Sequence, residues 1–331
     1  MYGGIHMPII LGIDGGGTST VAVLSDETGQ VLAKVVGGSS NPTAISRLQF
    51  ESELAKIISK LKEQNENAFE KVECCFAGLS GVKELSFEKI AKSVIQQFYD
   101  DTVSIIIEND ACIALFSGTL GMPGIVQIAG TGAITYCLDS HNNSYRAGGW
   151  GYLFDDEGSG YDLGREALKA VVKSYDHRGT ETVLTEKVLN HFQIDSVTKI
   201  VDCIYNDEHP RAIIAPLSRY VIEAAEEGDY VAQVILSRAA QQYILAIEAC
   251  ASQARWDVRK ELPTVLAGGV FTNFNLFYDV LMKQPMNFQL QFLQPKLIPV
   301  GGAIIGGLKQ LNEEVTTEFI QNFAEQMKMK Y

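Results

Sequence analysis

The chain has 331 residues, and because 46% of them are hydrophobic it can bury two cores, so two domains are expected. Its formal net charge of −13 argues against nucleic acid or an anionic membrane surface as a partner. The sequence contains no apolar run of membrane-spanning length, no signal peptide and no cysteine spacing typical of zinc, which together favour a cytoplasmic protein.

The first distinctive feature is a glycine-rich turn between two apolar segments, residues 9–13 and 21–24, each suited to a buried strand. Gly15, Gly16 and Gly17 let the backbone approach a ligand with its amides facing an anion, and hydroxyls follow at residues 18–20. Asp14, at the end of the first strand, places a carboxylate where a metal carried by a polyphosphate could sit. The turn lacks a Walker lysine and is followed by a strand, so we interpret it as a phosphate-binding hairpin; an ordinary turn is the alternative.

The next elements alternate between strands and helices, which predicts an α/β domain. After the hairpin we expect a strand at 31–35, a loop at 37–42, a helix at 44–65, a strand at 72–79, a helix at 87–99 and a strand at 103–107. Asp110 follows this last strand, on the side of the sheet where open α/β proteins carry their chemistry. It could act as a general base, or it could simply cap the helix expected at 111–118.

The opening pattern then recurs about 115 residues later, which indicates two related domains facing each other across a cleft. A strand at 124–129 leads into a turn of Gly130, Thr131, Gly132 and Ala133, and a strand at 134–138 follows. The remainder is predicted to be mainly helical, at 162–175, 182–192, 197–205, 210–227 and 230–254, with a strand at 264–267. We place the domains at 8–116 and 117–312, followed by a helix at 313–331 that packs back on the first domain or covers a partner.

These motifs together resemble the sugar kinase/Hsp70/actin superfamily, whose members have duplicated ribonuclease H-like (actin-like ATPase) domains. Within it, DGGGTST, SSNP, END, AGTGA, GGWGYLFDDEGSGYDLG and LAGGV resemble the N-acetylglucosamine kinase branch of the BadF/BadG/BcrA/BcrD ATPase family. That family also includes ATPase activators of benzoyl-CoA reductase and hydroxyacyl-CoA dehydratase. The resemblance spans Ile9 to Gly307, and its most specific part is GGWG followed by DEGSGYDLG.

The resemblance implies ATP and Mg²⁺ as cofactors and assigns residues to each ligand. Asp110 would be the base that accepts the proton of a sugar hydroxyl. The other sugar-binding positions would be Asn41, Gly132, Ala133, Gly149, Trp150 and Asp156. The nucleotide would be held by Gly15, Gly16, Gly17, Thr18, Gly130, Thr131 and Gly132 at the phosphates, and by Ala215, Gly268 and Gly269 near the adenosine, where a surface without Cβ atoms lets the nucleoside approach. Asp14 would hold Mg²⁺ through water.

Simpler structural roles remain open for three of these positions. Asn41 could be a routine turn residue, Trp150 could pack against the protein instead of a sugar ring, and residues 155–157 could be a solvated, helix-capping acidic turn. Ala133 stands where much of the family has Ser, which removes a hydroxyl near the sugar.

The leading hypothesis is therefore an ATP-dependent kinase that phosphorylates the 6-hydroxyl of an amino sugar: N-acetylglucosamine first, with N-acetylmuramic acid and glucosamine as alternatives. Family precedent suggests a homodimer. The competing hypotheses are an activator ATPase and a sugar sensor without turnover. An activator should carry a cluster-binding cysteine just before the second turn, where this chain has Gln127, Ile128 and Ala129. A sensor should carry a DNA-binding helix-turn-helix, for which neither end has room or basic charge.

Overall fold

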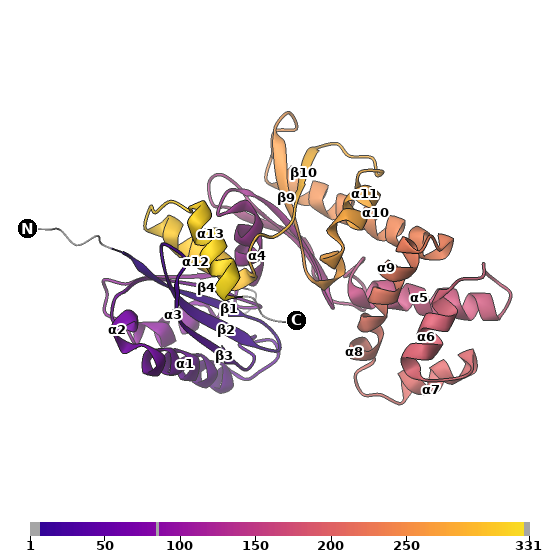
Figure 1. Ribbon diagram of the computed structural model, residues 1–331, viewed down its shortest axis with the longest axis horizontal. Coiled ribbons are helices and arrows are strands. Elements are labelled where there is room, and N and C mark those ends of the chain that lie inside the picture. Colours follow the sequence, from indigo (N-terminus) through magenta and orange to yellow (C-terminus); the bar gives the residue numbers. More distant parts are fainter. Residues whose placement is uncertain (1–6, 84–85, 328–331) are drawn as a thin grey trace, which may run out of the picture. The chain divides into compact units, whose positions relative to one another are not determined.

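The computed structural model describes residues 7–83 and 86–327, which divide into two compact units. Unit 1 combines Met1–Met122 with Pro295–Tyr331, and unit 2 is Pro123–Gln294 (Figure 1). In the described part of the chain, no helix is long and apolar enough to cross a membrane.

Unit 1 is built on a five-stranded sheet with the order β3-β2-β1-β4-β5. Its strands are β1 (Ile9–Gly15), β2 (Thr20–Asp26), β3 (Val31–Gly37), β4 (Val72–Leu79) and β5 (Ser104–Glu108). Its helices are α1 (Arg47–Gln64), α2 (Glu66–Phe69), α3 (Glu88–Gln96), α4 (Asp110–Thr119), α12 (Pro299–Gln310) and α13 (Thr317–Gln326). Strands β1, β2 and β3 form an antiparallel meander, and β4 and β5 continue the sheet in parallel with β1.

Helices cover both faces of this sheet, which explains why β1 is apolar at nearly every position. Leu11 packs in the core with Phe50 of α1. Ile10 points to the opposite face, where a Cβ on Gly307 of α12 would lie 2.4 Å from its side chain. α12 also packs closely on α4, since a Cβ at Gly302 would lie 1.9 Å from the Ile113 carbonyl oxygen. Glycine at these positions lets the helix approach within reach of β1 and α4.

Unit 2 repeats the topology of unit 1. Its strands are β6 (Gly124–Ala129), β7 (Ala133–Leu138), β8 (Ser144–Gly148), β9 (Glu261–Ala267) and β10 (Gln289–Leu293), in the order β10-β9-β6-β7-β8. The first three strands are again an antiparallel meander, and β9 and β10 are again parallel to the first. Read from its other edge, this order is that of unit 1, so the two sheets are topologically equivalent and the expected duplication of an α/β domain is confirmed.

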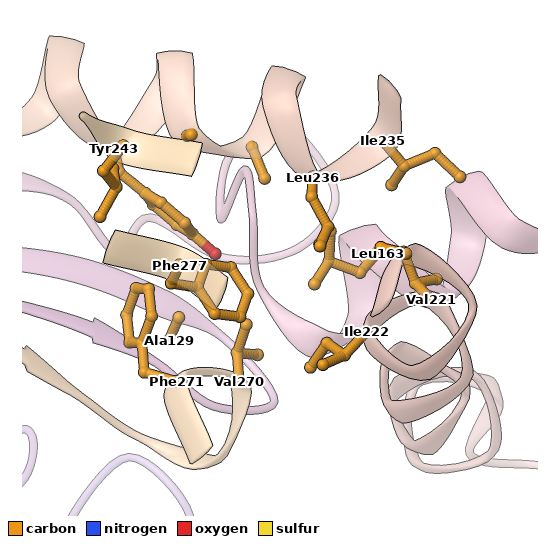
Figure 2. Packing of buried hydrophobic residues seen from close by; sticks show 14 of the residues in the cluster. Ala129, Leu163, Val221, Ile222, Ile235, Leu236, Tyr243, Val270, Phe271 and Phe277 are labelled. Carbon is orange, nitrogen blue, oxygen red and sulfur yellow. The ribbon is translucent and has the colours of Figure 1, made fainter. Parts of the chain in front are cut away.

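Most of unit 2 outside the sheet is helical, as expected. The helices are α5 (Gly160–Tyr175), α6 (Leu184–Phe192), α7 (Ile200–Tyr205), α8 (Pro210–Ile214), α9 (Ser218–Glu226), α10 (Tyr230–Gln253) and α11 (Phe274–Leu281). Short 3-10 turns occur at η1 (Val197–Lys199), η2 (Ala215–Leu217) and η3 (Gly269–Thr272). Figure 2 shows how Tyr243 and Leu236 of α10 pack with Phe271, Phe277 and Leu163 in one continuous apolar core. This core fixes the elements that carry the turns of unit 2.

The C-terminal segment belongs to unit 1, so the division of the chain differs from the predicted boundary at residue 312. α12 packs on β1 and α4 through its glycines, and α13 lies against the β2–β3 turn, where Asn322 Nδ2 donates to the Thr28 carbonyl oxygen at 2.8 Å (Figure 1). Val31 N donates to Gln326 Oε1 at 3.0 Å. Predicted helix residues 328–331 lie outside the described residues.

Candidate functional site

The first glycine-rich turn joins β1 to β2 in unit 1. Gly15 is required by packing, since a Cβ there would lie 2.2 Å from Ser40 Oγ. Gly16 closes the turn, with its N–H donating to the Ser19 carbonyl oxygen at 2.9 Å. Gly17 and Thr18 are exposed at the tip. The turn thus uses two of its glycines for its own geometry and presents the third, with the Thr18 hydroxyl, to solvent.

Thr20 does not contribute a hydroxyl to this tip, contrary to the expectation from the sequence. It begins β2 and is fully buried. Its Oγ1 lies 2.7 Å from the Gly38 carbonyl oxygen and 2.8 Å from Ser40 Oγ, so it ties the turn to the loop after β3. The difference arises because Thr20 is the first residue of β2, whereas Thr18 still belongs to the turn.

Two carboxylates of unit 1, Asp14 and Asp110, influence each other at the carboxyl ends of β1 and β5. Burial and, as the smaller cause, the negative charge of nearby Asp110 together raise the pKa of Asp14 to about 7. The helix-capping role left open for Asp110 is filled by its neighbour, since Asn109 Oδ1 accepts from the Ala111 amide at 2.9 Å and Asp110 is the first residue of α4. The arrangement is suited to a divalent cation, because such an ion would relieve the repulsion between two carboxylates.

Asn41 lies in the same unit, and its side chain has both a turn role and a neighbour in the residue that follows β4. Its Oδ1 accepts from Thr43 N at 2.8 Å, the hydrogen bond of an Asx turn. Its Nδ2 lies 3.4 Å from Ser80 Oγ and would be 3.8 Å from a Cβ on Gly17. Asn41 is therefore a turn residue that also faces the first glycine-rich turn. Ser80 was missed at the sequence level, although it directly follows the predicted strand 72–79.

The second turn, in unit 2, is held in place by the helix that follows the acidic segment. Gly130 N donates to the Gly132 carbonyl oxygen at 2.9 Å, and Gly160 N, at the start of α5, donates to the Gly130 carbonyl oxygen at 2.7 Å. Thr131 is exposed at the tip, and Ala133 is buried as the first residue of β7. As in unit 1, a threonine hydroxyl is presented at the end of a strand hairpin.

The acidic segment 155–157 holds the GGWG loop (residues 148–151) in place, so it is not simply a solvated turn. Trp150 N donates to Asp155 Oδ2 at 2.7 Å, and Gly151 N donates to Asp156 Oδ1 at 3.4 Å. The helix cap is provided instead by Ser159. Trp150 itself is 65% exposed, with the Arg146 guanidinium 4.0 Å from its ring centre. Its indole is not part of the core and remains open to a ligand.

Asp156 is the buried carboxylate of this loop, at 4% exposure, in the left-handed backbone region at φ +64°. Burial raises its pKa, while Arg211 and the Gly151 amide act in the opposite direction. Asp156 also lies beside the second turn, because a Cβ on Gly132 would be 2.8 Å from its Oδ2. The predicted sugar-binding position therefore touches the predicted phosphate turn within one unit.

Tyr243 packs against Gly158, the residue that follows the acidic segment. It points from α10 into the core (Figure 2). Its hydroxyl donates to the Gly158 carbonyl oxygen. A Cβ on Gly158 would lie 2.3 Å from the tyrosine ring, and Gly158 has a φ of +77°. This contact joins residues 85 positions apart in the chain. No local sequence pattern could have revealed it.

The predicted adenosine positions divide between a cavity and the protein interior. A cavity of about 470 Å³ is lined by Gly269, by Ser218 of α9 and by Phe274 of α11. Gly268 is explained by the fold alone, with φ +101° and a would-be Cβ only 2.4 Å from the Ala129 carbonyl oxygen. Ala215 is buried and reaches the cavity only indirectly, since its carbonyl oxygen accepts from Ser218 Oγ at 2.8 Å. Gly269 is thus the predicted position that faces open space.

The structure groups the predicted residues in two sets, one on each unit. Unit 1 carries Asp14, the first turn, Asn41 and Asp110, whereas unit 2 carries the second turn, the GGWG loop with Asp156, and the cavity at Gly269. Among the described residues, no cluster of three or more histidine, cysteine, aspartate or glutamate side chains could hold a metal by itself. Any metal here would need ligands from water or substrate in addition to carboxylates.

Two equivalent sheets, each with a Gly/Thr turn between its first two strands, define a duplicated actin-like fold of the sugar-kinase type. The same fold occurs in a ROK hexokinase from Thermus thermophilus, which is 16% identical, with a TM-score of 0.52 and coverage of 92% of this chain and 99% of that one. A provisionally named N-acetylglucosamine kinase from Chromobacterium violaceum is 25% identical, with a TM-score of 0.65 and coverage of 90% and 98%.

The model of the BadF/BadG/BcrA/BcrD ATPase family matches residues 11–306, and the protein belongs to this family. An N-acetylmuramic acid/N-acetylglucosamine kinase of Clostridium acetobutylicum is 34% identical over 277 residues, covering 84% of this chain and 90% of the relative. An N-acetyl-D-glucosamine kinase of Dictyostelium discoideum is 32% identical over 287 residues, with the same coverage. The resemblance stated from the sequence motifs is confirmed.

Proposed function

We propose that this protein is an ATP-dependent kinase that transfers a phosphoryl group to the 6-hydroxyl of an amino sugar. The observation that carries the proposal is the pair of Gly/Thr turns on equivalent sheets, in a chain that carries an aspartate after β5 and belongs to a family of ATPases. The named activities of the relatives from Clostridium and Dictyostelium support an amino sugar as the acceptor. We place the protein in the cytoplasm and expect a homodimer.

Asp110 is the proposed general base. Its carboxylate accepts the proton of the sugar 6-hydroxyl as that oxygen forms a bond to the γ-phosphorus of ATP. The bond between the γ-phosphorus and the oxygen bridging to the β-phosphate breaks, and ADP leaves with the electron pair. Because Asn109 caps α4, the helix does not need the Asp110 side chain for that role.

The phosphates are proposed to bind at the two turns. In unit 1 the exposed tip offers the Gly17 amide and the Thr18 hydroxyl, and in unit 2 Thr131 offers the equivalent hydroxyl. Gly15, Gly16, Gly130 and Gly132 shape these turns more than they contact a ligand directly. Mg²⁺ would be held through water by Asp14 and would neutralise charge on the polyphosphate. The Asp14–Asp110 pair fits such an ion, since Mg²⁺ binds through one or two carboxylates and keeps several waters.

The sugar is proposed to bind to residues in loops, which supply the hydrogen bonds and an aromatic ring. Asp156 would accept hydrogen bonds from sugar hydroxyls, Asn41 would hold further hydroxyls, and Trp150 would lie against the ring. Gly149 and Gly132 bring backbone close to the sugar, and Ala133 replaces a hydroxyl by a methyl group. We favour N-acetylglucosamine, with N-acetylmuramic acid and glucosamine as alternatives. The cavity at Gly269 would take the adenosine, with Ala215 behind it.

The test is coupled ADP release with Mg-ATP against N-acetylglucosamine, N-acetylmuramic acid, glucosamine, N-acetylmannosamine and glucose. We expect turnover with an amino sugar, reduced roughly 10²–10⁴-fold in Asp110→Ala, because a positioned general base contributes that much. Asp176→Ala, which removes an exposed carboxylate at the end of α5, is the matched control and should retain activity. ATP hydrolysis that is indifferent to every sugar would contradict the proposal and favour a protein partner.

A further inference from the structure

The phosphoryl group in this reaction carries negative charge that the two turns cannot neutralise by themselves. Neither turn contains a lysine or arginine, and the chain as a whole has a net charge of −13. Phosphoryl transfer depends largely on positioning and on cations placed where charge develops. A cationic side chain close to one of the turns would add to the charge that the proposed Mg²⁺ neutralises.

Arg211, at the start of α8, has its guanidinium group beside the second turn. Its Nη2 would lie 2.7 Å from a Cβ on Gly132, so a side chain at residue 132 would displace the guanidinium group from this position. The guanidinium carbon is 5.1 Å from the centre of the Tyr152 ring, and Nη2 is 3.4 Å from Asp156 Oδ2. The turn, the ring and the carboxylate thus all lie next to one cation.

Most of the hydrogen-bonding capacity of this cation is unused within the described residues. An arginine has five N–H donors in a planar fork, and Arg211 makes one long hydrogen bond, to Asp156. Its Nε is buried and has no hydrogen-bond partner in the part of the chain that the structure describes. Arg259, by contrast, binds both oxygens of Asp257 at 3.0 Å.

The contact with Asp156 leaves other N–H groups of the guanidinium available for a ligand. At 3.4 Å it is longer than a typical charge-assisted hydrogen bond, and the pKa of Asp156 stays raised by burial despite the arginine beside it. The Arg211 side chain is also 37% exposed, so a ligand at the turn can reach it. A planar fork matches the geometry of phosphate oxygens better than a lysine would.

We propose that Arg211 is a catalytic residue of the phosphoryl transfer, binding the transferred phosphoryl group at the second turn through the free side of its guanidinium fork. This inference rests on the kinase function proposed above. Arg211 exchanges no proton: the sugar oxygen still bonds to the γ-phosphorus, its proton still goes to Asp110, and ADP still departs with the electron pair. The arginine stabilises the charge on the equatorial oxygens while Nη2 stays on Asp156.

The test compares wild-type protein with Arg211→Ala and Arg211→Lys at saturating Mg-ATP, using the sugar that the wild type phosphorylates. We expect Arg211→Ala to lower kcat roughly 10²–10³-fold with the sugar KM changed less than about threefold, since one charge-stabilising donor has that effect. Arg211→Lys should recover little, because it lacks the fork. Guanidinium ion added in solution should raise the kcat of Arg211→Ala about tenfold. Arg178→Ala, an exposed arginine of the same unit, is the control.

Two results would overturn the inference. Retention of kcat within about threefold in Arg211→Ala would show that the phosphoryl group does not need this cation. A loss confined to the sugar KM, without rescue by guanidinium, would show that Arg211 only positions Asp156. An inactive wild-type protein would instead contradict the kinase function itself, so the two failures are distinguishable. Circular dichroism and thermal unfolding of each variant separate misfolding from a loss of chemistry.

Discussion

The first prediction concerns the stability cost of Asp14. Replacing it by Asn removes a charge while keeping the shape of the side chain. Burial and the charge of Asp110 raise the pKa of Asp14 from 3.8 to about 7, so the folded protein disfavours its ionised form. We therefore expect Asp14→Asn to be more stable than the wild type at pH 8 and, if Asp14 holds Mg²⁺ as proposed, to lose turnover.

The size of the effect follows from the shift in pKa. The folded state binds the proton more tightly than the unfolded chain, so the stability penalty is absent below about pH 4, grows as the pH rises, and is complete above pH 7. A rise from 3.8 to about 7, at 1.36 kcal/mol per unit, sets a ceiling of about 4 kcal/mol. Because Asp14 remains partly open to solvent, we expect a gain of about 1–3 kcal/mol.

Differential scanning calorimetry at pH 8 and pH 4.5, without nucleotide, measures this gain. At pH 8 the transition of unit 1 should rise by roughly 2–8 °C, and at pH 4.5 the two proteins should nearly coincide. Asp139→Asn is the control with the opposite sign. Burial would raise the pKa of Asp139, but hydrogen bonds from Asn143 and His141 lower it overall, so its loss should destabilise the protein at pH 8.

The reasoning is refuted if Asp14→Asn is equally stable or less stable at pH 8. It is also refuted if the gain is the same at both pH values, because a purely steric effect would not depend on ionisation. A gain at pH 8 that persists in an Asp110→Asn background at full size would show that Asp110 contributes nothing to the raised pKa.

Two further predictions concern the architecture of unit 2. Gly268→Ala should lower the free energy of unfolding by about 1–3 kcal/mol, because it combines a positive φ with a contact of 2.4 Å to the Ala129 carbonyl oxygen. Gly269→Ala should fold normally and raise the KM for ATP. Urea unfolding measures the first effect and ATP titration measures the second. Tyr243→Phe should cost about 1–2 kcal/mol in urea unfolding, since it leaves the buried Gly158 carbonyl without its donor, and unchanged stability would contradict this.

The sequence predicts best the strands whose hydrophobic pattern is contained in consecutive residues. β1 and β6 are covered on both faces, so they are nearly continuous apolar runs and were placed correctly with their turns. β8 and β10 were not predicted. They are the two edge strands of the second sheet, and because only part of each is buried, their polar residues resemble loops.

The candidate site divides in the same way. The glycine and threonine turns are visible in the sequence because their chemistry is contained in consecutive residues. Asn109 and Asp110 are adjacent polar residues before one helix, and only the geometry reveals which of them caps it. Arg211 meets Asp156 across 55 positions in the chain, so its role depends on the folded arrangement of α8 and the acidic segment. Local spacing carries no signal for such a pair.

The return of residues 295–331 to the first sheet has a consequence for synthesis on the ribosome. Unit 2 is one continuous segment and can complete its core as soon as residue 294 is available. Unit 1 cannot, because the face of β1 that carries Ile10 is covered by α12. During translation that apolar face stays exposed until α12 has been synthesised. It is therefore the surface that most needs protection by chaperones. A message truncated near codon 295 would leave it permanently uncovered and prone to aggregation.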